Sequence, residues 1–403
     1  MLLEMMNGKV AVAIMLMASI VLGNHTNAQK QIPFKVIVNK ALIAAEKQSL
    51  LMAKKYEEQE GRLPRTFEKD KDVSSDSRWW CSGFFPGVLW YLYENNRNAE
   101  LLKYAKLYTA RVEREKYTTD NHDVGFMLYC SFGNGLRLTG DPSYNEVLLT
   151  GAKSLATRYK PEVGLIRSWD HNKKLWQYPV IIDNIMNLEL LLWASRYSGD
   201  PVFKRISISH ADKTIQHHFR PNSSSYHLVS YDTLSGQPHL KQTHQGAANE
   251  SAWSRGQAWG LYGYTYLYRE TKEQRYLEQA KKIATFIIDH PRMPKDYIPY
   301  WDFDAPQIPN TPRDASAAAL IAAALTELSD YVGGAESKKY RMVVETQIRT
   351  LASPEYTAAV GENGDFILKH STGAYPMQSE VDVPLTYADY YYLEALTRLK
   401  NKK

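Results

Sequence analysis

Two aspartates, Asp123 and Asp183, are the residues of this 403-residue chain with the clearest potential for chemistry. Each stands just before an apolar segment, and they occupy equivalent points of two successive sequence repeats. Two carboxyl groups that share a partly dry site push their proton affinities apart, which leaves one protonated acid and one carboxylate. Such a pair suits general acid–base work on a sugar. The alternative is that each aspartate only caps the N-terminus of a helix, a position that aspartate favours.

Tryptophan and arginine side chains accompany the two aspartates. The chain contains 28 Tyr and 9 Trp, and aromatic rings can fill a core or stack on sugar rings. Core packing and sugar stacking are therefore both open for Trp80, Trp169, Trp253 and Trp259. Arg255 is harder to explain by packing, because an arginine at the start of a buried helix needs an anionic partner.

The sequence lacks the motifs that are typical of several classes of function. No group of His, Asp or Cys residues has metal-ligand spacing, so we expect no catalytic metal and no cofactor. Isolated histidines such as His210 and His227 would ordinarily be core residues. A Gly-rich phosphate loop and a Gly-x-Ser-x-Gly elbow are also absent. The net charge is +5 without a long lysine run, so nucleic acid is not an expected partner, whereas an acidic substrate is allowed.

A short turn motif recurs along the chain. Its clearest copies are the Gly-Asp-Pro sequences at 140–142 and 199–201, and weaker copies follow at 269–272 and 331–334. Glycine can end one helix, aspartate can cap the next, and proline fits the first turn of that next helix. Each motif therefore predicts a turn that joins two helices.

The segments on the two sides of these turns differ in hydrophobicity. Those after a turn are amphipathic and predict half-exposed helices, namely 99–114, 143–159, 201–219, 275–290 and 336–353, with a similar opening helix at 34–58. Those before a turn are apolar, aromatic or small nearly all round and predict buried helices, namely 84–94, 122–138, 182–198, 252–269, 313–331 and 386–399. This alternation predicts an all-α (α/α)6 barrel, a six-hairpin toroid in a single domain with little strand.

The inner helices of such a barrel run in one direction, so their N-termini meet at one mouth. Helix N-termini carry partial positive charge and free N–H groups, which favour a bound anion. Asp123, Asp183 and Arg255 all fall at predicted inner-helix starts. We therefore expect the chemistry at this mouth.

The N-terminal segment has the pattern of an export signal. An apolar run at 10–23 follows Lys9 and precedes small residues, which predicts a signal peptide at 1–28 and a mature barrel domain at 29–403. The alternative is an uncleaved anchor. No later segment is long and apolar enough to cross a membrane, so we expect an exported protein, periplasmic or secreted. Cys81 and Cys130 could pair in an oxidising compartment, but two cysteines do not establish a disulfide.

A series of motifs, in order along nearly the whole mature chain, resembles the unsaturated glucuronyl hydrolases of glycoside hydrolase family 88. The matching stretches are 80–87 (WCSGFFPG), 89–94 (LWYLYE), 122–126 (HDVGF), 167–169 (RSW), 182–187 (IDNIMN), 243–246 (THQG), 251–259 (SAWSRGQAW) and 300–306 (YWDFDAP). The family fold is an (α/α)6 barrel, in agreement with the repeat pattern.

The resemblance implies an enzyme that removes a 4,5-unsaturated uronic acid from the non-reducing end of oligosaccharides made by polysaccharide lyases. The family hydrates the C4=C5 double bond, and the resulting hemiketal opens and breaks the glycosidic bond. By position, Asp183 matches the family's general acid/base and Asp123 its partner carboxylate. The resemblance places these residues in the substrate pocket, with tryptophans stacked on sugar faces and Arg255 on the uronate: Trp80, His122, Trp169, His227, Gln245, Trp253, Arg255 and Trp259.

The expected partners are unsaturated glycosaminoglycan di- and oligosaccharides, and we expect a monomer. Some relatives that prefer sulfated chondroitin carry a Ser-x-x-Ser-x-Lys run before the last inner helix, whereas the corresponding stretch here, 373–382, is shorter and lacks the lysine. A heparin-type, unsulfated or differently sulfated disaccharide therefore stays open. The alternatives are an unsaturated rhamnogalacturonyl hydrolase acting on pectin fragments, a non-catalytic glycan-binding toroid, and a sugar epimerase that relies on histidines.

Overall fold

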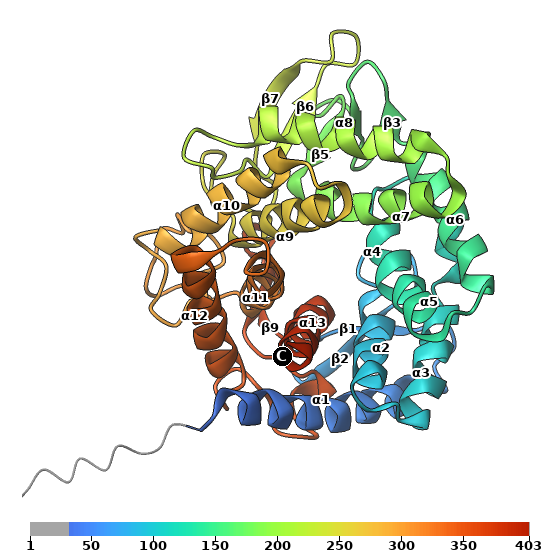
Figure 1. Ribbon diagram of the computed structural model, residues 1–403, viewed down its shortest axis with the longest axis vertical. Coiled ribbons are helices and arrows are strands. Elements are labelled where there is room, and N and C mark those ends of the chain that lie inside the picture. The colour runs from blue at the N-terminus through green and yellow to red at the C-terminus, as the bar shows by residue number, and fades with distance from the viewer. Residues whose placement is uncertain (1–31, 403) are drawn as a thin grey trace, which may run out of the picture. The chain divides into compact units, whose positions relative to one another are not determined.

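Paired helices form a closed ring in the computed structural model, which describes residues 32–402 (Figure 1). The inner helices are α2 (Phe84–Asn96), α4–η2–α5 (Val124–Leu128, Tyr129–Gly133, Asn134–Thr139), η3–α7 (Ile182–Asn187, Leu188–Ser198), α9 (Ser254–Thr271), α11 (Ala315–Leu328) and α13 (Thr386–Asn401). The outer helices are α1 (Phe34–Tyr56), α3 (Ala99–Ala110), α6 (Ser143–Ala156), α8 (Pro201–His218), α10 (Gln274–Asp289) and α12 (Gly334–Leu351). The predicted (α/α)6 barrel is confirmed, and the signal peptide predicted at 1–28 lies outside the described residues.

The two rings differ in burial as their sequences predict. All residues of the inner helix α11 are buried except Glu327. The outer helix α10 buries a single stripe, which includes Tyr276, Ile283 and Ile287, and leaves its charged face in water. A helix that is apolar all round belongs inside, and an amphipathic helix packs one face against it.

The Gly-Asp-Pro motifs form the predicted turns. Gly140 and Gly199 have left-handed backbone, with φ of 69° and 74°, and each donates its N–H to a carbonyl of the helix that it ends. Glycine adopts this conformation without the cost that a Cβ imposes. The Asp200 side chain then accepts a hydrogen bond from the N–H of Val202 at 2.8 Å and caps α8.

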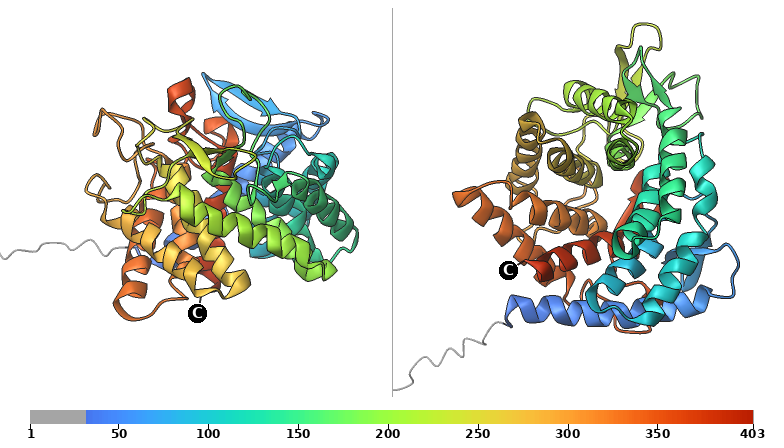
Figure 2. Two further views of the ribbon diagram at one scale, coloured as in Figure 1. Left: turned by 90° about the horizontal axis from the view of Figure 1, so that it is seen from above. Right: turned by 45° about the vertical axis from the view of Figure 1, so that its right-hand side comes forward.

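Short antiparallel strands occur in the connections that lead into inner helices. They are β1 (Leu63–Glu68), β2 (Lys71–Ser75), β3 (Tyr159–Lys160), β4 (Leu165–Ile166), β5 (Pro179–Ile181), β6 (Leu228–Tyr231), β7 (Pro238–Gln242), β8 (Ser371–Ala374) and β9 (Ser379–Val383). β5, β6 and β7 form one three-stranded sheet, and the others form pairs. The left view of Figure 2 shows the blue β1–β2 pair on the upper side of the ring, with the C-terminus on the lower side. The strands thus build one mouth of the barrel.

The second inner helix is broken, although its sequence predicted one continuous helix over 122–138. A π-helical turn, η2, separates α4 from α5. At the start of α4, a Cβ on Gly125 would lie 2.6 Å from the Cα of Asn187, and Phe126 donates its N–H to Oδ1 of Asn187 at 2.8 Å. The absent side chain at Gly125 lets the second and third inner helices touch close to both aspartates.

Both cysteines, Cys81 and Cys130, are buried and free, so they do not form the disulfide that the sequence left open. Burial raises the pKa of each thiol. Among residues 32–402, no helix combines the length and hydropathy that a membrane span needs.

Candidate active site

Neither Asp123 nor Asp183 caps a helix with its side chain. Asp123 stands at the N-cap position of α4 but makes no side-chain capping bond. Asp183 lies inside the first turn of η3, and its Oδ1 is buried without a hydrogen-bond partner. Asp314 shows what a cap looks like in this fold, because its carboxylate accepts the N–H of Ser316. The capping interpretation of Asp123 and Asp183 is therefore wrong.

The β5–β6 pair brings His227 to Asp183. Ile181 of β5 pairs with Leu228 of β6, and the N–H of Ile182 donates to the carbonyl of His227 at 3.0 Å. Asp183 directly follows Ile182, so this hydrogen bond places Asp183 beside His227. Nε2 of His227 lies 3.8 Å from Oδ1 of Asp183.

Backbone contacts fix the tautomer of His227. Its Nδ1 accepts hydrogen bonds from the N–H groups of His244 at 2.9 Å and Gln245 at 3.1 Å, so the neutral ring must carry its proton on Nε2. Burial, followed by the neighbouring His244 and Arg255, lowers the pKa of His227 well below its usual range. His227 therefore presents an N–H toward Asp183 and is not a base.

A separate loop positions Asp123 and His122. His122 donates its backbone N–H to the carbonyl of Ser168 at 3.1 Å, and Asn121 pairs with Trp169 in an isolated bridge. Nε2 of His122 lies 3.3 Å from Oδ1 of Asp123. Burial lowers the pKa of His122 to about 3, so this ring is also neutral at physiological pH. The motifs at 122–126 and 167–169 thus meet in space.

The two aspartates both hold their protons more tightly than usual. Burial and, after it, the charge of Asp183 raise the pKa of Asp123 to about 8, against the opposing charge of Arg158. Burial also raises the pKa of Asp183 to about 7, against the opposing charge of Arg255 and the indole of Trp259. The pair can therefore hold one proton near neutral pH, which is the state that general acid catalysis needs.

Arg255 has an anionic partner within the protein. The side chain is 2% exposed, and its Nη1 donates to Oδ2 of Asp314 at 3.1 Å and to the carbonyl of Thr372 at 2.5 Å. Nη2 donates to the carbonyl of Gly373 at 2.6 Å. The guanidinium also lies 4.4 Å from the ring centroid of Trp253. Its charge nevertheless acts on Asp183, because it opposes the rise that burial causes in the pKa of that carboxyl. Direct contact with a uronate stays a prediction.

Three of the remaining predicted residues are half-buried, namely Gln245, Trp169 and Trp80. Gln245 donates its side-chain N–H to the Gly373 carbonyl that Arg255 also holds. The half-buried Trp169 stacks on His171, with ring centroids 5.0 Å apart. Trp80, also half-buried, packs on an aromatic cluster that includes Tyr387.

Two tryptophans are core residues. Trp253 is 3% exposed, with His227 packed on its ring. Trp259 has no exposed surface and packs against Phe126 and Tyr391. That Trp259 belongs to the substrate pocket stays a prediction, and its indole lies beside Asp183. Its indole N–H has no hydrogen-bond partner and contributes to the electrostatics of Asp183.

Sequence reasoning missed some residues that shape this site. Arg158 follows α6, an outer helix, yet its charge lowers the pKa of Asp123 and of His122. His244 orients His227 through a backbone N–H, which no side-chain pattern reveals. Within residues 32–402, no group of three or more His, Cys, Asp or Glu side chains is arranged to hold a metal ion.

Comparison with known proteins adds the family. The model of Glycosyl Hydrolase Family 88 matches residues 52–402. The chain belongs to glycosyl hydrolase family 88. Family 88 proteins are glycoside hydrolases, so this barrel is an enzyme, and the predicted resemblance is confirmed.

Individual relatives of this family 88 chain cover most of its length. An unsaturated glucuronyl hydrolase of Formosa agariphila is 47% identical over 326 residues, which is 81% of each chain. A crystal structure of an unsaturated glucuronyl hydrolase specific for heparin is 49% identical with a TM-score of 0.87, and the match covers 90% of this chain and 96% of that one. A mutant unsaturated glucuronyl hydrolase from Streptococcus agalactiae, complexed with dGlcA-GalNAc6S, is 28% identical with a TM-score of 0.76 and covers 91% and 92%.

Proposed function

We propose that this family 88 enzyme is an unsaturated glucuronyl hydrolase. Its substrate is an oligosaccharide, made by a lyase from a glycosaminoglycan, with a 4,5-unsaturated uronic acid at its non-reducing end. The observation that carries the proposal is the buried pair Asp123 and Asp183, whose raised pKa values keep a proton available near neutral pH. The names of the relatives point to the same activity.

Asp183 performs both proton transfers in this mechanism. Its protonated carboxyl adds a proton to C4 of the double bond, and positive charge develops at C5 and the ring oxygen. The Asp183 carboxylate then removes a proton from water as that water adds to C5. The hemiketal opens with cleavage of the C5–ring oxygen bond, and the aldehyde at C1 forms as the next sugar leaves with its hydroxyl. Asp183 has then donated one proton to C4 and taken one from water, so it is protonated again.

Two neighbours act on Asp183 through this cycle, and Asp183 in turn acts on Asp123. The Nε2–H of His227 faces Asp183 and favours its carboxylate during the second transfer. The nearby charge of Arg255 acts in the same direction. When Asp183 is a carboxylate, its charge opposes ionisation of Asp123, so Asp123 keeps its own proton.

The glycosaminoglycan type is a finer part of the proposal. The unsaturated glucuronyl hydrolase specific for heparin is 49% identical to this chain. This identity supports a heparin-type disaccharide as the preferred substrate. The hairpin of β8 and β9 occupies the stretch where some relatives carry a sulfate-binding lysine, and it contains no lysine.

A panel of unsaturated disaccharides tests the proposal. The purified enzyme is mixed with disaccharides from heparin, chondroitin and rhamnogalacturonan, and the loss of ultraviolet absorbance of the conjugated uronate is followed. We expect turnover of heparin-type substrates to exceed that of the others. Turnover confined to the rhamnogalacturonan product would support the pectin-degrading alternative, and binding without turnover would support a glycan-binding toroid.

We also propose that the protein is exported, to the periplasm or the medium, because 1–28 has the pattern of a signal peptide. Expression of the full chain in a bacterium, followed by fractionation and N-terminal sequencing, tests this. A mature protein that begins near residue 29 outside the cytoplasm is expected, and an intact N-terminus in the cytoplasm would refute it.

A further inference from the structure

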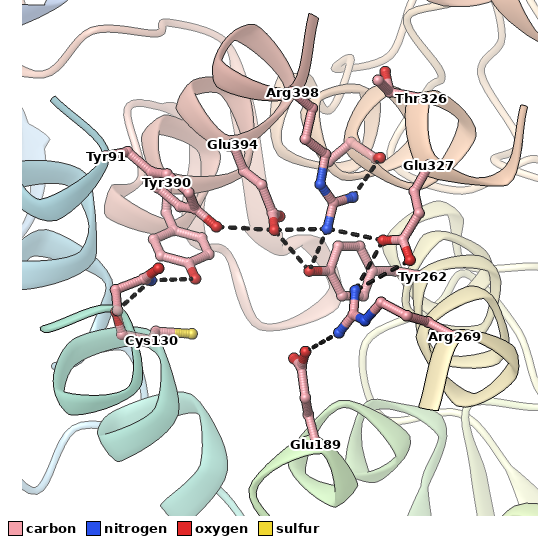
Figure 3. A network of polar contacts seen from close by, with 12 residues as sticks. Tyr91, Cys130, Glu189, Tyr262, Arg269, Thr326, Glu327, Tyr390, Glu394 and Arg398 are labelled. Atoms are coloured by element: carbon pink, nitrogen blue, oxygen red, sulfur yellow. Dashed lines mark hydrogen bonds and ion pairs between the residues drawn. The ribbon is translucent and has the colours of Figure 1, made fainter. Parts of the chain in front are cut away.

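A cavity opens at the end of the barrel away from the two aspartates. It has a volume of about 500 Å³ and is lined by residues late in the inner helices, such as Glu94 of α2, Arg269 of α9 and Arg398 of α13. Asp123 and Asp183, by contrast, stand at inner-helix starts. Figure 3 shows the polar side chains that cross this end of the ring.

Glu394 is the buried carboxylate of this cavity, and its two oxygens differ. The side chain belongs to a residue that is 5% exposed. Oε1 accepts hydrogen bonds from the hydroxyls of Tyr91 at 2.9 Å and Tyr262 at 2.8 Å and from Nη2 of Arg398 at 2.9 Å (Figure 3). Oε2 is buried and has no partner. A carboxylate oxygen in this state needs a donor, because a buried acceptor without one costs free energy.

Thr397 adds a second unsatisfied group to the same cavity. It lies about one helical turn after Glu394 on α13, is 6% exposed, and lines the cavity together with Glu394. Its Oγ1 is also buried without a hydrogen-bond partner. Two neighbouring polar atoms of one helix thus lack partners on the wall of one cavity.

The charges of the lining favour a cation. The lining carboxylates are Glu94, Glu189, Glu270 and Glu394, and the lining guanidinium groups are Arg137, Arg269 and Arg398. The guanidinium groups are engaged in ion pairs, such as Arg269 with Glu189 and Arg398 with Glu394. Carboxylates exceed guanidinium groups by one, and the C-terminal ends of the inner helices add partial negative charge. A single positive charge would balance the lining.

Aromatic rings complete this environment. The cavity is lined by Tyr91, Tyr129, Trp193, Tyr262 and Tyr390. Electron-rich ring faces attract organic cations, most strongly where water is excluded. The cavity volume falls in the range of small-molecule sites.

We propose that this cavity binds a small organic cation whose ammonium group donates to Oε2 of Glu394 and to Oγ1 of Thr397. The aromatic rings would pack on its hydrocarbon part. The site is additional to the proposed function, because the negative lining repels an anionic uronate.

Binding of three ring compounds of similar size tests the proposal. The purified mature enzyme is titrated by calorimetry with cyclohexylammonium, cyclohexanol and cyclohexanecarboxylate at pH 7.5. We expect saturable one-to-one binding of the ammonium compound only. Thr397→Val should weaken it about five-fold, as the loss of one hydrogen bond does. Glu394→Gln should weaken it more than ten-fold, and Glu113→Gln, at an exposed outer position, should leave it unchanged.

Four results would overturn the proposal. Binding of cyclohexanol as tight as that of cyclohexylammonium would show that charge plays no role. An unchanged affinity of Thr397→Val for cyclohexylammonium would show that the ligand binds elsewhere. The valine variant keeps this test valid if Glu394→Gln does not fold. Displacement by an equal concentration of potassium chloride would identify an alkali-ion site instead. Displacement by an unsaturated disaccharide would place the ammonium compound at the catalytic mouth, whereas failure of the disaccharide to turn over would affect the proposed function alone.

Discussion

Replacement of Asp183 by asparagine should separate catalysis from folding. In the proposed reaction Asp183 donates one proton and receives another, and a general acid–base group contributes about 10²–10⁴-fold to a rate. A group that serves both transfers belongs at the upper end of that range. We therefore expect kcat with an unsaturated disaccharide to fall about 10⁴-fold, which corresponds to about 5 kcal/mol in the barrier.

The same substitution should stabilise the fold at alkaline pH. Burial raises the pKa of Asp183 from its ordinary value of 3.8 to about 7. Below the lower value the carboxyl is protonated in both the folded and the unfolded chain, so it contributes nothing. Between the two values only the unfolded chain loses the proton, and the free energy of unfolding falls as pH rises. Above about pH 7 the loss is complete and reaches about 4 kcal/mol, at about 1.4 kcal/mol for each tenfold change in proton affinity.

Urea denaturation of wild type and Asp183→Asn at pH 4, 7 and 9 measures this effect. The asparagine variant should gain on the wild type as pH rises, by up to about 4 kcal/mol at pH 9. Asp70→Asn, at an exposed position, controls for the substitution itself. A stability difference that does not change between pH 4 and 9 would refute the burial argument. A loss of less than ten-fold in kcat would refute the role of Asp183 as the acid.

Three further predictions concern the site and its support. For the wild type, kcat/KM should fall as pH rises through about 7, because the protonated form of Asp183 is lost there; a rate that stays level to pH 9 would contradict this. Arg255→Met removes a charge that lowers the pKa of Asp183, so the alkaline fall should move to higher pH. It should also cost about 3–5 kcal/mol in urea denaturation, because Asp314 stays buried without its partner; an unshifted pH profile would contradict the electrostatic role. Gly83→Ala would place a Cβ 2.2 Å from a backbone carbonyl of α4 and should cost about 3 kcal/mol, whereas Gly333→Ala, with open space around it, should fold as wild type does.

Helix pairing could be predicted from the sequence because both of its signals are local. The Gly-Asp-Pro motifs at 140–142 and 199–201 mark turns by backbone chemistry, and the all-apolar composition of α11 marks an inner helix. The break at η2 could not be predicted. Nothing in the residues of 129–133 alone distinguishes a π-helical turn from a continuing helix.

The candidate site was predicted in composition but only partly in geometry. Asp123 and Asp183 could be selected because of their positions at two helix starts. The contact between His227 and Asp183 depends on β5, a strand of three residues, which is too short to show a period. The burial of Trp259 could not be predicted, because a helix that is apolar all round gives no sign of which side faces the mouth.

The closure of the ring by α13 has a consequence for synthesis of the chain. α13 packs against α1, α2 and α11, so the last inner helix joins both ends of the sequence. A ribosome that has not yet reached residue 386 holds a nascent chain in which the buried sides of α2 and α11 have no cover. Stop codons before α13 should therefore yield insoluble fragments even when they spare both aspartates, and the barrel can close only after α13 has been made.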